Sequence, residues 1–246
     1  MRAIILSAGQ GSRLLPLTAD RPKCLIDFSG RTLLDWQLDA LAANGIEEAT
    51  VVVGFRDDQV EAALARRERG PRVRTRFNPF YKVADNLGTV WIAREDFAGD
   101  CLVLNGDTLV SPALVGRVLA ARLPGIAVTV DEKAGGYDED DMKVVRGADG
   151  RLARIGKRLG DAPVNAESIG LIVFRGDGAA RFIRTVDAVM RTPEGTTSWY
   201  LKVIDRIAQT ERVETCSIHG EQWGEVDFPQ DVAAAQALTA GWAAHG

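Results

Sequence analysis

The residues from Gly9 to Lys23 have the types and spacing needed to hold phosphate groups. Gly9 and Gly11 follow the apolar run 3–6, and Arg13, Arg21 and Lys23 come soon after. Because glycine lacks a Cβ, a glycine loop lets backbone N–H groups approach phosphate oxygens closely. Arginine adds a forked donor that stays charged. The pattern therefore predicts a polyphosphate site on this loop.

Three other interpretations of the same loop are weaker. A dinucleotide-binding loop needs G-x-G-x-x-G, and its third glycine position holds Leu14 here. A Walker A loop needs G-x-x-x-x-G-K-[ST], which the chain lacks. An ordinary strand-to-helix turn does not require several basic residues, so their presence favours phosphate binding.

Acidic residues far apart in the chain form the second candidate group. Asp107 follows the buried run 101–104, at the end of a predicted strand where open α/β sheets place ligand-binding loops. Mg²⁺ is typically held by one or two carboxylates together with phosphates and water. Glu225 and Asp227 are the best further ligands, because their i, i+2 spacing on an extended segment puts both on one face. Asp231 is predicted to cap the helix that follows.

The first half of the chain alternates between strand and helix patterns. This alternation favours an α/β fold with a mixed, mostly parallel sheet and helices on both faces. The predicted strands are 3–6, 49–53, 73–77 and 101–104, and the predicted helices are 32–43, 57–67 and 86–97.

The pattern changes after residue 125. Strands at 126–130, 142–145, 152–155 and 168–174 are joined by glycine-rich turns, which predicts antiparallel strands and a small flap. Helices at 178–190 and 197–209, a strand at 213–218 and a helix at 231–243 complete the chain. No linker stands out, so we expect one domain, 1–246, with a nucleotide-binding half, 1–125, and an acceptor-binding half, 126–246.

Composition narrows the classes of partner and compartment. The formal net charge of -4 gives no sign of a nucleic-acid or membrane partner, and no apolar run reaches the length of a membrane span. Three widely spaced cysteines suit reduced thiols in a cytoplasmic protein better than a disulfide or zinc framework. The oligomeric state stays open, a homodimer included.

The stretch Ser7-Ala8-Gly9-Gln10-Gly11-Ser12-Arg13-Leu14-Leu15-Pro16-Leu17-Thr18, with Arg21-Pro22-Lys23 after it, resembles the signature of the sugar-phosphate nucleotidyltransferase superfamily. That signature reads A-G-x-G-[ST]-R-L-x-P-L-T followed by P-K, and Ser7 departs from its usual alanine. The resemblance implies a Rossmann-like fold of the GT-A type. It also implies that Arg13 and Lys23 act on the phosphates in catalysis. The implied nucleotide contacts are Leu6, Ala8, Gly9, Gln10, Gly11, Ser12, Asp85 and Asn86.

The segment Trp223-Gly224-Glu225-Val226-Asp227 resembles the C-terminal signature of the phosphocholine cytidylyltransferase branch. Met142-Lys143-Val144 and Ile155-Gly156-Lys157 are similar to that branch as well. The resemblance implies a Mg²⁺-dependent enzyme that uses CTP and a small phosphorylated alcohol or phosphonate. Its product would be CDP- or CMP-linked, with pyrophosphate released. Phosphocholine-like, aminoethylphosphonate and inositol phosphate acceptors all remain open.

Residues of the second half are candidates for binding the acceptor. Lysines supply charge for its phosphate, and aromatic and acidic side chains could enclose a trimethylammonium group. The candidates are Lys143, Lys157, Glu167, Trp199, Tyr200 and Trp223, with Tyr137 beside them. A phosphate nucleophile is already anionic at neutral pH, so the lack of a histidine-based motif fits this chemistry.

Three alternatives to a cytidylyltransferase stay open. A sugar-1-phosphate nucleotidyltransferase using UTP, dTTP or GTP would share the first loop. A protein that binds nucleotide without turnover would have less need of Lys23, Asp107 and Asp227 together. A related glycosyltransferase usually carries D-x-D, where this chain has Asn105-Gly106-Asp107.

Overall fold

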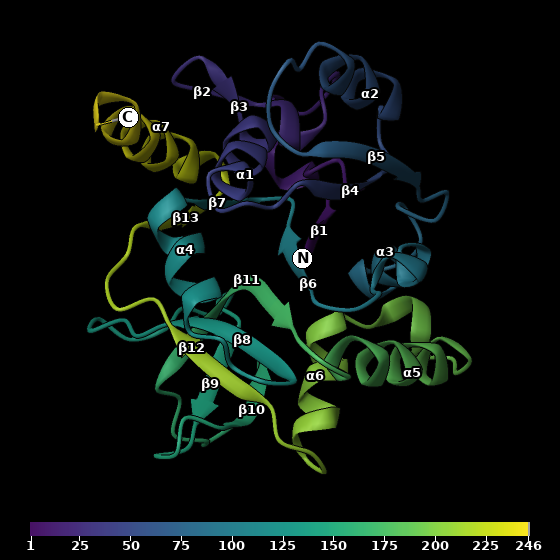
Figure 1. The fold of residues 1–246 in the computed structure, drawn as a ribbon, viewed down its shortest axis with the longest axis vertical. Helices are drawn as coiled ribbons and strands as arrows, with labels where there is room; N and C mark the ends of the chain where they lie inside the picture. The colour runs from purple at the N-terminus through teal and green to yellow at the C-terminus, as the bar shows by residue number, and fades with distance from the viewer. Residues whose placement is uncertain (246) are drawn as a thin grey trace.

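A nine-stranded mixed sheet runs through the computed structural model, which describes residues 1–245. Seven strands follow the order β10-β9-β11-β6-β1-β4-β5, while β8 pairs with β11 and β12 pairs with β8 (Figure 1). The strands of this sheet are β1 (Arg2–Leu6), β4 (Glu48–Val53), β5 (Arg72–Phe77), β6 (Cys101–Asn105), β8 (Ile126–Asp131), β9 (Lys143–Arg146), β10 (Leu152–Gly156), β11 (Ala166–Phe174) and β12 (Glu214–Ser217).

Parallel pairing at the centre places the first loop beside the acidic turn. Strand β1 pairs in parallel with β4 and with β6, and Leu6 stands opposite Asn105 in the β1–β6 register. Both strands carry apolar side chains on both faces, as expected for strands covered on both sides. Because their carboxyl ends meet at one edge, the loop after β1 and the turn that carries Asp107 become neighbours.

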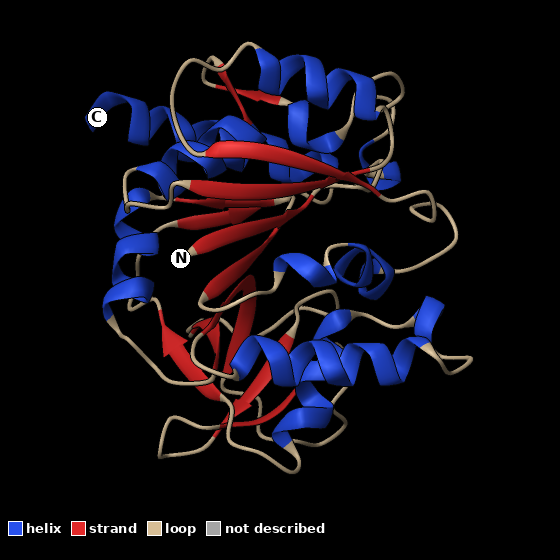
Figure 2. Ribbon diagram, turned by 45° about the vertical axis from the view of Figure 1, so that its right-hand side comes forward, coloured by secondary structure: helices blue, strands red, loops and turns tan. Residues whose placement is uncertain are grey.

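Helices cover both faces of the sheet, which confirms the predicted fold class (Figures 1 and 2). Helices α1, α2 and α4 pack on one face, and α3, α5 and α6 pack on the other. Helix α7 packs with the hairpin of β2 and β3 in a third cluster. The bounds are α1 (Leu33–Ala42), α2 (Asp57–Ala65), α3 (Asn86–Ile92), α4 (Pro112–Ala120), α5 (Gly178–Met190), α6 (Tyr200–Ala208), α7 (Pro229–His245), β2 (Asp27–Phe28) and β3 (Arg31–Thr32).

The expected antiparallel flap is the β9–β10 hairpin, which joins the sheet through β11. Strand β11 bends at Gly170, so its first residues pair with β9 and its last four pair with β6. Gly170 has φ +75°, and a Cβ there would lie 2.5 Å from Asn105 Nδ2. The bend therefore requires glycine, and it lets one strand serve both the flap and the central sheet.

Several elements differ from the sequence-based expectations. The helix predicted at 86–97 ends at Ile92 and continues as the 3-10 turn Arg94–Asp96, and the helix predicted at 197–209 begins at Tyr200. The short strands β7 (Thr108–Val110) and β13 (Trp223–Glu225) were not predicted, because three residues show no reliable alternation. Helix α4 was also missed, although Ser111 and Pro112 form a good start signal.

Helix α7 starts earlier than predicted. It begins at Pro229, so Asp231 lies in its first turn and is not the residue that precedes the helix. The Asp231 carboxylate still accepts hydrogen bonds from the backbone N–H groups of Asp227 and Phe228, at 2.8 and 2.7 Å. Its capping role is thus exerted from inside the helix. Among residues 1–245, no helix combines the length and apolar character needed to cross a lipid bilayer.

Candidate active site

A cavity of about 500 Å³ lies at the carboxyl ends of β1 and β6. Its size is within the usual range for small-molecule sites. All eight nucleotide-contact candidates line it: Leu6, Ala8, Gly9, Gln10, Gly11, Ser12, Asp85 and Asn86. Arg13, Lys23, Asp107 and Asp227 line it as well. The structure therefore brings the first loop and the acidic residues of distant segments to one place.

The first loop is shaped by its own hydrogen bonds. Gly11 has φ +75° and starts the 3-10 turn Ser12–Leu14, a backbone conformation that other residues rarely adopt. The buried Thr18 hydroxyl donates to the Gly11 carbonyl at 2.8 Å, and the Gln10 amide donates to the Thr18 carbonyl at 3.2 Å. A Cβ on Gly11 would lie 3.0 Å from the Cβ of Lys23. The absence of a side chain on Gly11 thus leaves room for the Lys23 side chain to pack against the loop.

Two short strands position the carboxylates. Strand β7 follows the Asp107 turn and pairs with β13, with Glu225 opposite Thr108. The Val226 N–H donates to the Asp107 carbonyl at 3.1 Å, which holds the start of the Asp227 segment against the turn. One ligand oxygen each from Asp107, Glu225 and Asp227 lies within 4.8 Å of the others.

Lys23 and Arg13 balance this negative charge. Lys23 Nζ lies 2.8 Å from Asp107 Oδ2 and 2.6 Å from Asp227 Oδ1, with its side chain only 14% exposed. Arg13 Nη2 lies 3.3 Å from Asp227 Oδ2, and its guanidinium stacks over the Phe228 ring, 4.9 Å from the centroid. Half of the Arg13 side chain remains exposed, so its free edge faces solvent at the cavity.

Burial and charge move the pKa values of these groups in different directions. Burial disfavours the charge on Lys23, but Asp107 and Asp227 outweigh it and hold the lysine pKa above its ordinary value. Burial also disfavours ionised Asp227, yet Lys23 and Arg13 keep its pKa below the usual range. Glu225 is exposed as a whole residue, and its carboxyl group lies close to those of Asp107 and Asp227. Loss of water, with the charges of Asp107 and Asp227, raises its pKa to about 8.

The donor set fits a divalent cation. Asp107 Oδ1 is buried and has no hydrogen-bond partner among the described residues, whereas Oδ2 is taken by Lys23. A buried oxygen without a partner costs free energy, and a cation would compensate that cost. Three carboxylates that converge beside a phosphate-binding loop are the oxygen ligands that Mg²⁺ prefers.

Three acceptor candidates lie on the flap side of the carboxylates. Lys157 Nζ lies 3.3 Å from Asp140 and 5.1 Å from the ring centroid of Trp199, which is 38% exposed. The positive charge of Lys157 also contributes to the lowered pKa of Asp227, which places it near the carboxylates. Glu167 is buried and pairs with Lys133 at 2.7 Å, and burial raises its pKa to about 7.

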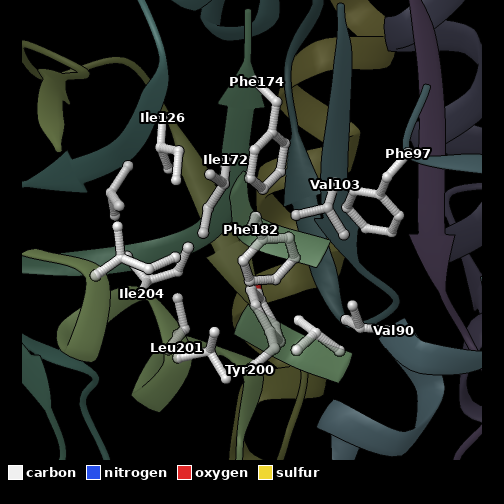
Figure 3. Packing of buried hydrophobic residues seen from close by; sticks show 14 of the residues in the cluster. Val90, Phe97, Val103, Ile126, Ile172, Phe174, Phe182, Tyr200, Leu201 and Ile204 are labelled. Carbon is white, nitrogen blue, oxygen red and sulfur yellow. The ribbon is translucent and has the colours of Figure 1, made fainter. Parts of the chain in front are cut away.

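Tyr200 is not a direct acceptor contact, contrary to the prediction. Its side chain is fully buried, and Figure 3 shows it among core residues such as Phe182 and Leu201. Its hydroxyl donates to Asn105 Oδ1 at 2.9 Å. Tyr200 therefore packs in the core, and its hydroxyl holds Asn105 at the end of β6.

None of the six acceptor candidates is among the residues that line the cavity, Trp223 and Lys143 included. The Trp223 indole N–H donates to Asp131 Oδ2 at 2.9 Å, and its ring packs against the core on the α1 side. The Lys143 amine donates to the carbonyls of Asp138 and Glu139 and so ties down the acidic loop. With Tyr200 in the core and the Trp223 N–H engaged, Trp199 is the exposed aromatic side chain among the three aromatic candidates Trp199, Tyr200 and Trp223.

Other cavity residues were missed by sequence reasoning. Tyr81, Lys82 and Ala84 come from the segment between β5 and α3, and Asn105 is the last residue of β6. The signal was available, because ligand-binding residues of open α/β sheets gather after the carboxyl ends of strands. Lys82 therefore adds a basic residue to the cavity from outside the first loop.

Comparison with known proteins identifies the family. Residues 3–165 match the model of the MobA-like NTP transferase domain. The chain is 27% identical to the CTP:phosphoglutamine cytidylyltransferase of Campylobacter jejuni, over 94% of this chain and 98% of that protein. It is 30% identical to the N-acetylmuramate alpha-1-phosphate uridylyltransferase of Caulobacter vibrioides, over 97% and 96%.

A solved structure supports the same fold. The CTP:phosphocholine cytidylyltransferase from Streptococcus pneumoniae superposes with a TM-score of 0.77 at 21% identity, over 97% of this chain and 98% of that one. The family match covers more than half of the chain, and the cavity carries the glycine loop and basic residues that handling a triphosphate requires. The chain therefore belongs to the MobA-like NTP transferase family and is a nucleotidyltransferase.

Proposed function

We propose that this nucleotidyltransferase transfers CMP from CTP to a small phosphorylated alcohol or phosphonate, with Mg²⁺ as its cofactor. The observation that carries the proposal is Lys23, held between Asp107 and Asp227 beside the glycine loop. A cation bridging two carboxylates next to a triphosphate site suits phosphoryl chemistry between two anionic substrates. The phosphoglutamine relative, which covers nearly the whole chain, supports cytidine as the base.

The reaction forms one P–O bond and breaks another. An anionic oxygen of the acceptor phosphate or phosphonate attacks the α-phosphorus of CTP. The bond from that phosphorus to the oxygen bridging the α- and β-phosphates breaks, and pyrophosphate leaves with the electron pair. Because the nucleophile is already ionised, no side chain has to remove a proton. Positioning and electrostatic stabilisation lower the barrier.

The residues of the first loop serve the nucleotide in this account. The backbone of Gly9 to Ser12 holds the triphosphate, and Arg13 offers its exposed edge to the β- and γ-phosphates. Lys23 moves from its carboxylate partners toward the α-phosphate as charge builds up there. Mg²⁺ held by Asp107, Glu225 and Asp227 would supply further neutralisation of phosphate charge.

The second half serves the acceptor. Lys157 is the candidate for the acceptor phosphate, since it lies near Asp227 and can leave its exposed partner Asp140 at little cost. Trp199 and Glu167 are the other two candidates for contact with the acceptor. We propose that 1–246 is one domain, with the nucleotide bound by 1–125 and the acceptor by 126–246. The sheet that runs unbroken through both halves supports a single domain.

A sugar-1-phosphate uridylyltransferase is the second candidate. It is favoured by the uridylyltransferase relative, which is 30% identical over nearly all of both chains. The first loop would act in the same way in both enzymes. The two candidates differ in the base and in the acceptor, which a substrate panel separates.

Pyrophosphate release tests the proposal directly. The purified chain is incubated with Mg²⁺, one of CTP, UTP, dTTP, GTP or ATP, and one acceptor at a time. The acceptors are phosphocholine, 2-aminoethylphosphonate, inositol 1-phosphate and hexose 1-phosphates. Release with CTP and a non-sugar acceptor supports the proposal. Release only with UTP and a sugar phosphate overturns it in favour of the second candidate.

A matched pair of variants shows whether the signal comes from this site. Asp227→Asn removes a carboxylate that pairs with Lys23, and we expect it to abolish release. Asp187→Asn is the control, because neither Asp187 nor its partner Trp91 lines the cavity and its side chain can still accept from the Trp91 indole N–H. Equal activity in both variants would show that Asp227 is not part of the reaction site.

A further inference from the structure

A buried glutamine on α1, Gln37, donates two hydrogen bonds to the turn that carries Asp107. Gln37 has no exposed surface. Its side-chain nitrogen donates to the carbonyl of Asn105 at 2.7 Å and to the carbonyl of Thr108 at 2.8 Å. These carbonyls stand at the two ends of the turn, with Gly106 and Asp107 between them. One amide group therefore joins both ends of the turn to a rigid helix.

Stability alone does not explain a glutamine at this position. Its neighbours on the same helix face, Leu34, Leu38 and Leu41, belong to the apolar core on this side of the sheet. The Gln37 Oε1 atom is buried and lacks a hydrogen-bond partner among the described residues. A buried unpartnered oxygen costs free energy. The two donated bonds are what the side chain contributes.

Other hydrogen bonds hold the turn at single points, whereas Gln37 joins its two ends. Gly106 N–H donates to the Leu6 carbonyl at 3.1 Å, which fixes one point between the ends. The Thr108 hydroxyl donates to the Ile169 carbonyl at 3.2 Å, which fixes the far side. The Asp107 backbone itself is contacted through its carbonyl by Val226 N–H. A shift of the turn would therefore move Asp107 and the Glu225 strand together.

We propose that Gln37 is a positioning residue that sets Asp107 and its β13 neighbours for the divalent cation. This inference rests on the proposed function, because it requires the three carboxylates to hold a metal. Partners that orient metal ligands commonly change metal affinity by about 10- to 100-fold when they are removed. Gln37 touches neither substrate nor metal, so its effect must pass through the turn.

The test compares two amide deletions, one inside α1 and one two residues after its end. Gln37→Met keeps the volume and loses both donated bonds. Asn44→Leu is the matched control, because the Asn44 amide also donates to two backbone carbonyls, those of Ala40 and Pro112, away from the turn. Binding of Mn²⁺ alone is measured by electron paramagnetic resonance, and CTP binding is measured separately in EDTA. Thermal unfolding is recorded for each variant.

We expect Gln37→Met to weaken Mn²⁺ binding by at least about tenfold while CTP binding in EDTA stays within about twofold. Asn44→Leu should bind Mn²⁺ like the wild type even if its melting temperature falls as much. Gln37→Glu is the second variant, in case Gln37→Met does not fold. Its neutral acid form can donate only one of the two bonds, so it should weaken Mn²⁺ binding as well.

Unchanged Mn²⁺ affinity in the folded Gln37 variant would overturn the inference and leave the metal site standing. Equal loss of Mn²⁺ affinity in Asn44→Leu would also overturn it, because the effect would then be general loosening of α1. If the wild type bound Mn²⁺ no better than Asp227→Asn, the metal site itself would fail, and the inference with it.

Discussion

The nucleotide end and the acceptor end of the site are built in different ways. At the nucleotide end, one continuous loop supplies backbone groups and small side chains, and glycines allow them to approach a ligand. At the acceptor end, long side chains from the β8–β9 connection, β11, the β10–β11 connection and the residue before α6 contact one another, as Lys157 does with Asp140 and Trp199 and Lys133 with Glu167. In the proposed function, the first end would receive phosphate without losing internal ion pairs of its backbone groups, whereas the second would exchange internal ion pairs for a substrate.

This difference suggests a division of roles between the two ends. We propose that the nucleotide end carries the reaction and that the acceptor end sets the selectivity. In the proposed function, backbone donors and Lys23 act on phosphate groups that every nucleoside triphosphate carries. The paired side chains of the acceptor end would act on groups that differ between acceptors. Substitutions at the two ends should therefore change different kinetic constants.

The largest effect is expected from Lys23→Met. This change removes the cation between Asp107 and Asp227 and leaves their negative charges facing the incoming phosphates. We expect kcat to fall by at least about 100-fold, equivalent to about 3 kcal/mol of barrier. Steady-state pyrophosphate release measures it. A loss below about tenfold would show that Lys23 supports the fold and not the reaction.

Lys82→Met and Lys157→Met form a pair that separates the two ends. Lys82 lines the nucleotide cavity, and Lys157 lies beside Trp199 on the flap side. We expect Lys82→Met to raise the KM for the nucleotide and Lys157→Met to raise the KM for the acceptor, each by about tenfold, as for one charge-assisted contact. If both variants raised the same KM, the division into two ends would be wrong.

Gly170→Ala should lower the stability of the fold moderately, because Gly170 forms the bend of β11 beside Asn105. Alanine is strained at φ +75°, and its Cβ would meet Asn105 Nδ2. We expect the free energy of unfolding to fall by about 1–2 kcal/mol. Chemical denaturation measures it, and Gly135→Ala is the control, because nothing lies within 4 Å of the Cβ it would add. Equal stability of the two variants would contradict the account of the β11 bend.

The smallest effect concerns pH. Burial raises the pKa values of Glu167 and Glu225 to about 7 and about 8, from an ordinary value of 4.5. Between pH 4.5 and about 8 these two carboxyl groups hold more protons in the folded state than in the unfolded state. The stability that the two groups contribute is therefore lost as the pH rises toward 8. In EDTA, the melting temperature should therefore decline over this range, and Mg²⁺ should restore part of it at pH 8. A Glu225→Gln variant with the same decline would contradict the assignment for Glu225.

Local patterns predicted the fold and the first loop well, because their signals lie within short segments. The apolar run of β1, the glycines and Arg13 are contiguous, and the central strands are long enough to recognise. Asp107 and Asp227 were also predicted, since each follows a recognisable segment.

The acceptor end was harder to predict because its contacts join distant residues. Nothing local to Tyr200 shows that its ring enters the core, where Phe182 packs against it with ring centroids 6.5 Å apart. Nor does the sequence show that β7 and β13 pair, because each has three residues and they lie more than 100 positions apart. Gln37 acts through the same kind of distant contact, with the carbonyls of Asn105 and Thr108.

Diffraction from crystals soaked with Mn²⁺ and CTP, without acceptor, shows which residues bind the metal ion and the triphosphate. We expect an anomalous peak bonded to Asp107 and Asp227, with the triphosphate along Gly9 to Ser12 and Lys23 close to the α-phosphate. A nucleotide bound elsewhere, or a metal ion that contacts neither Asp107 nor Asp227, would contradict this expectation.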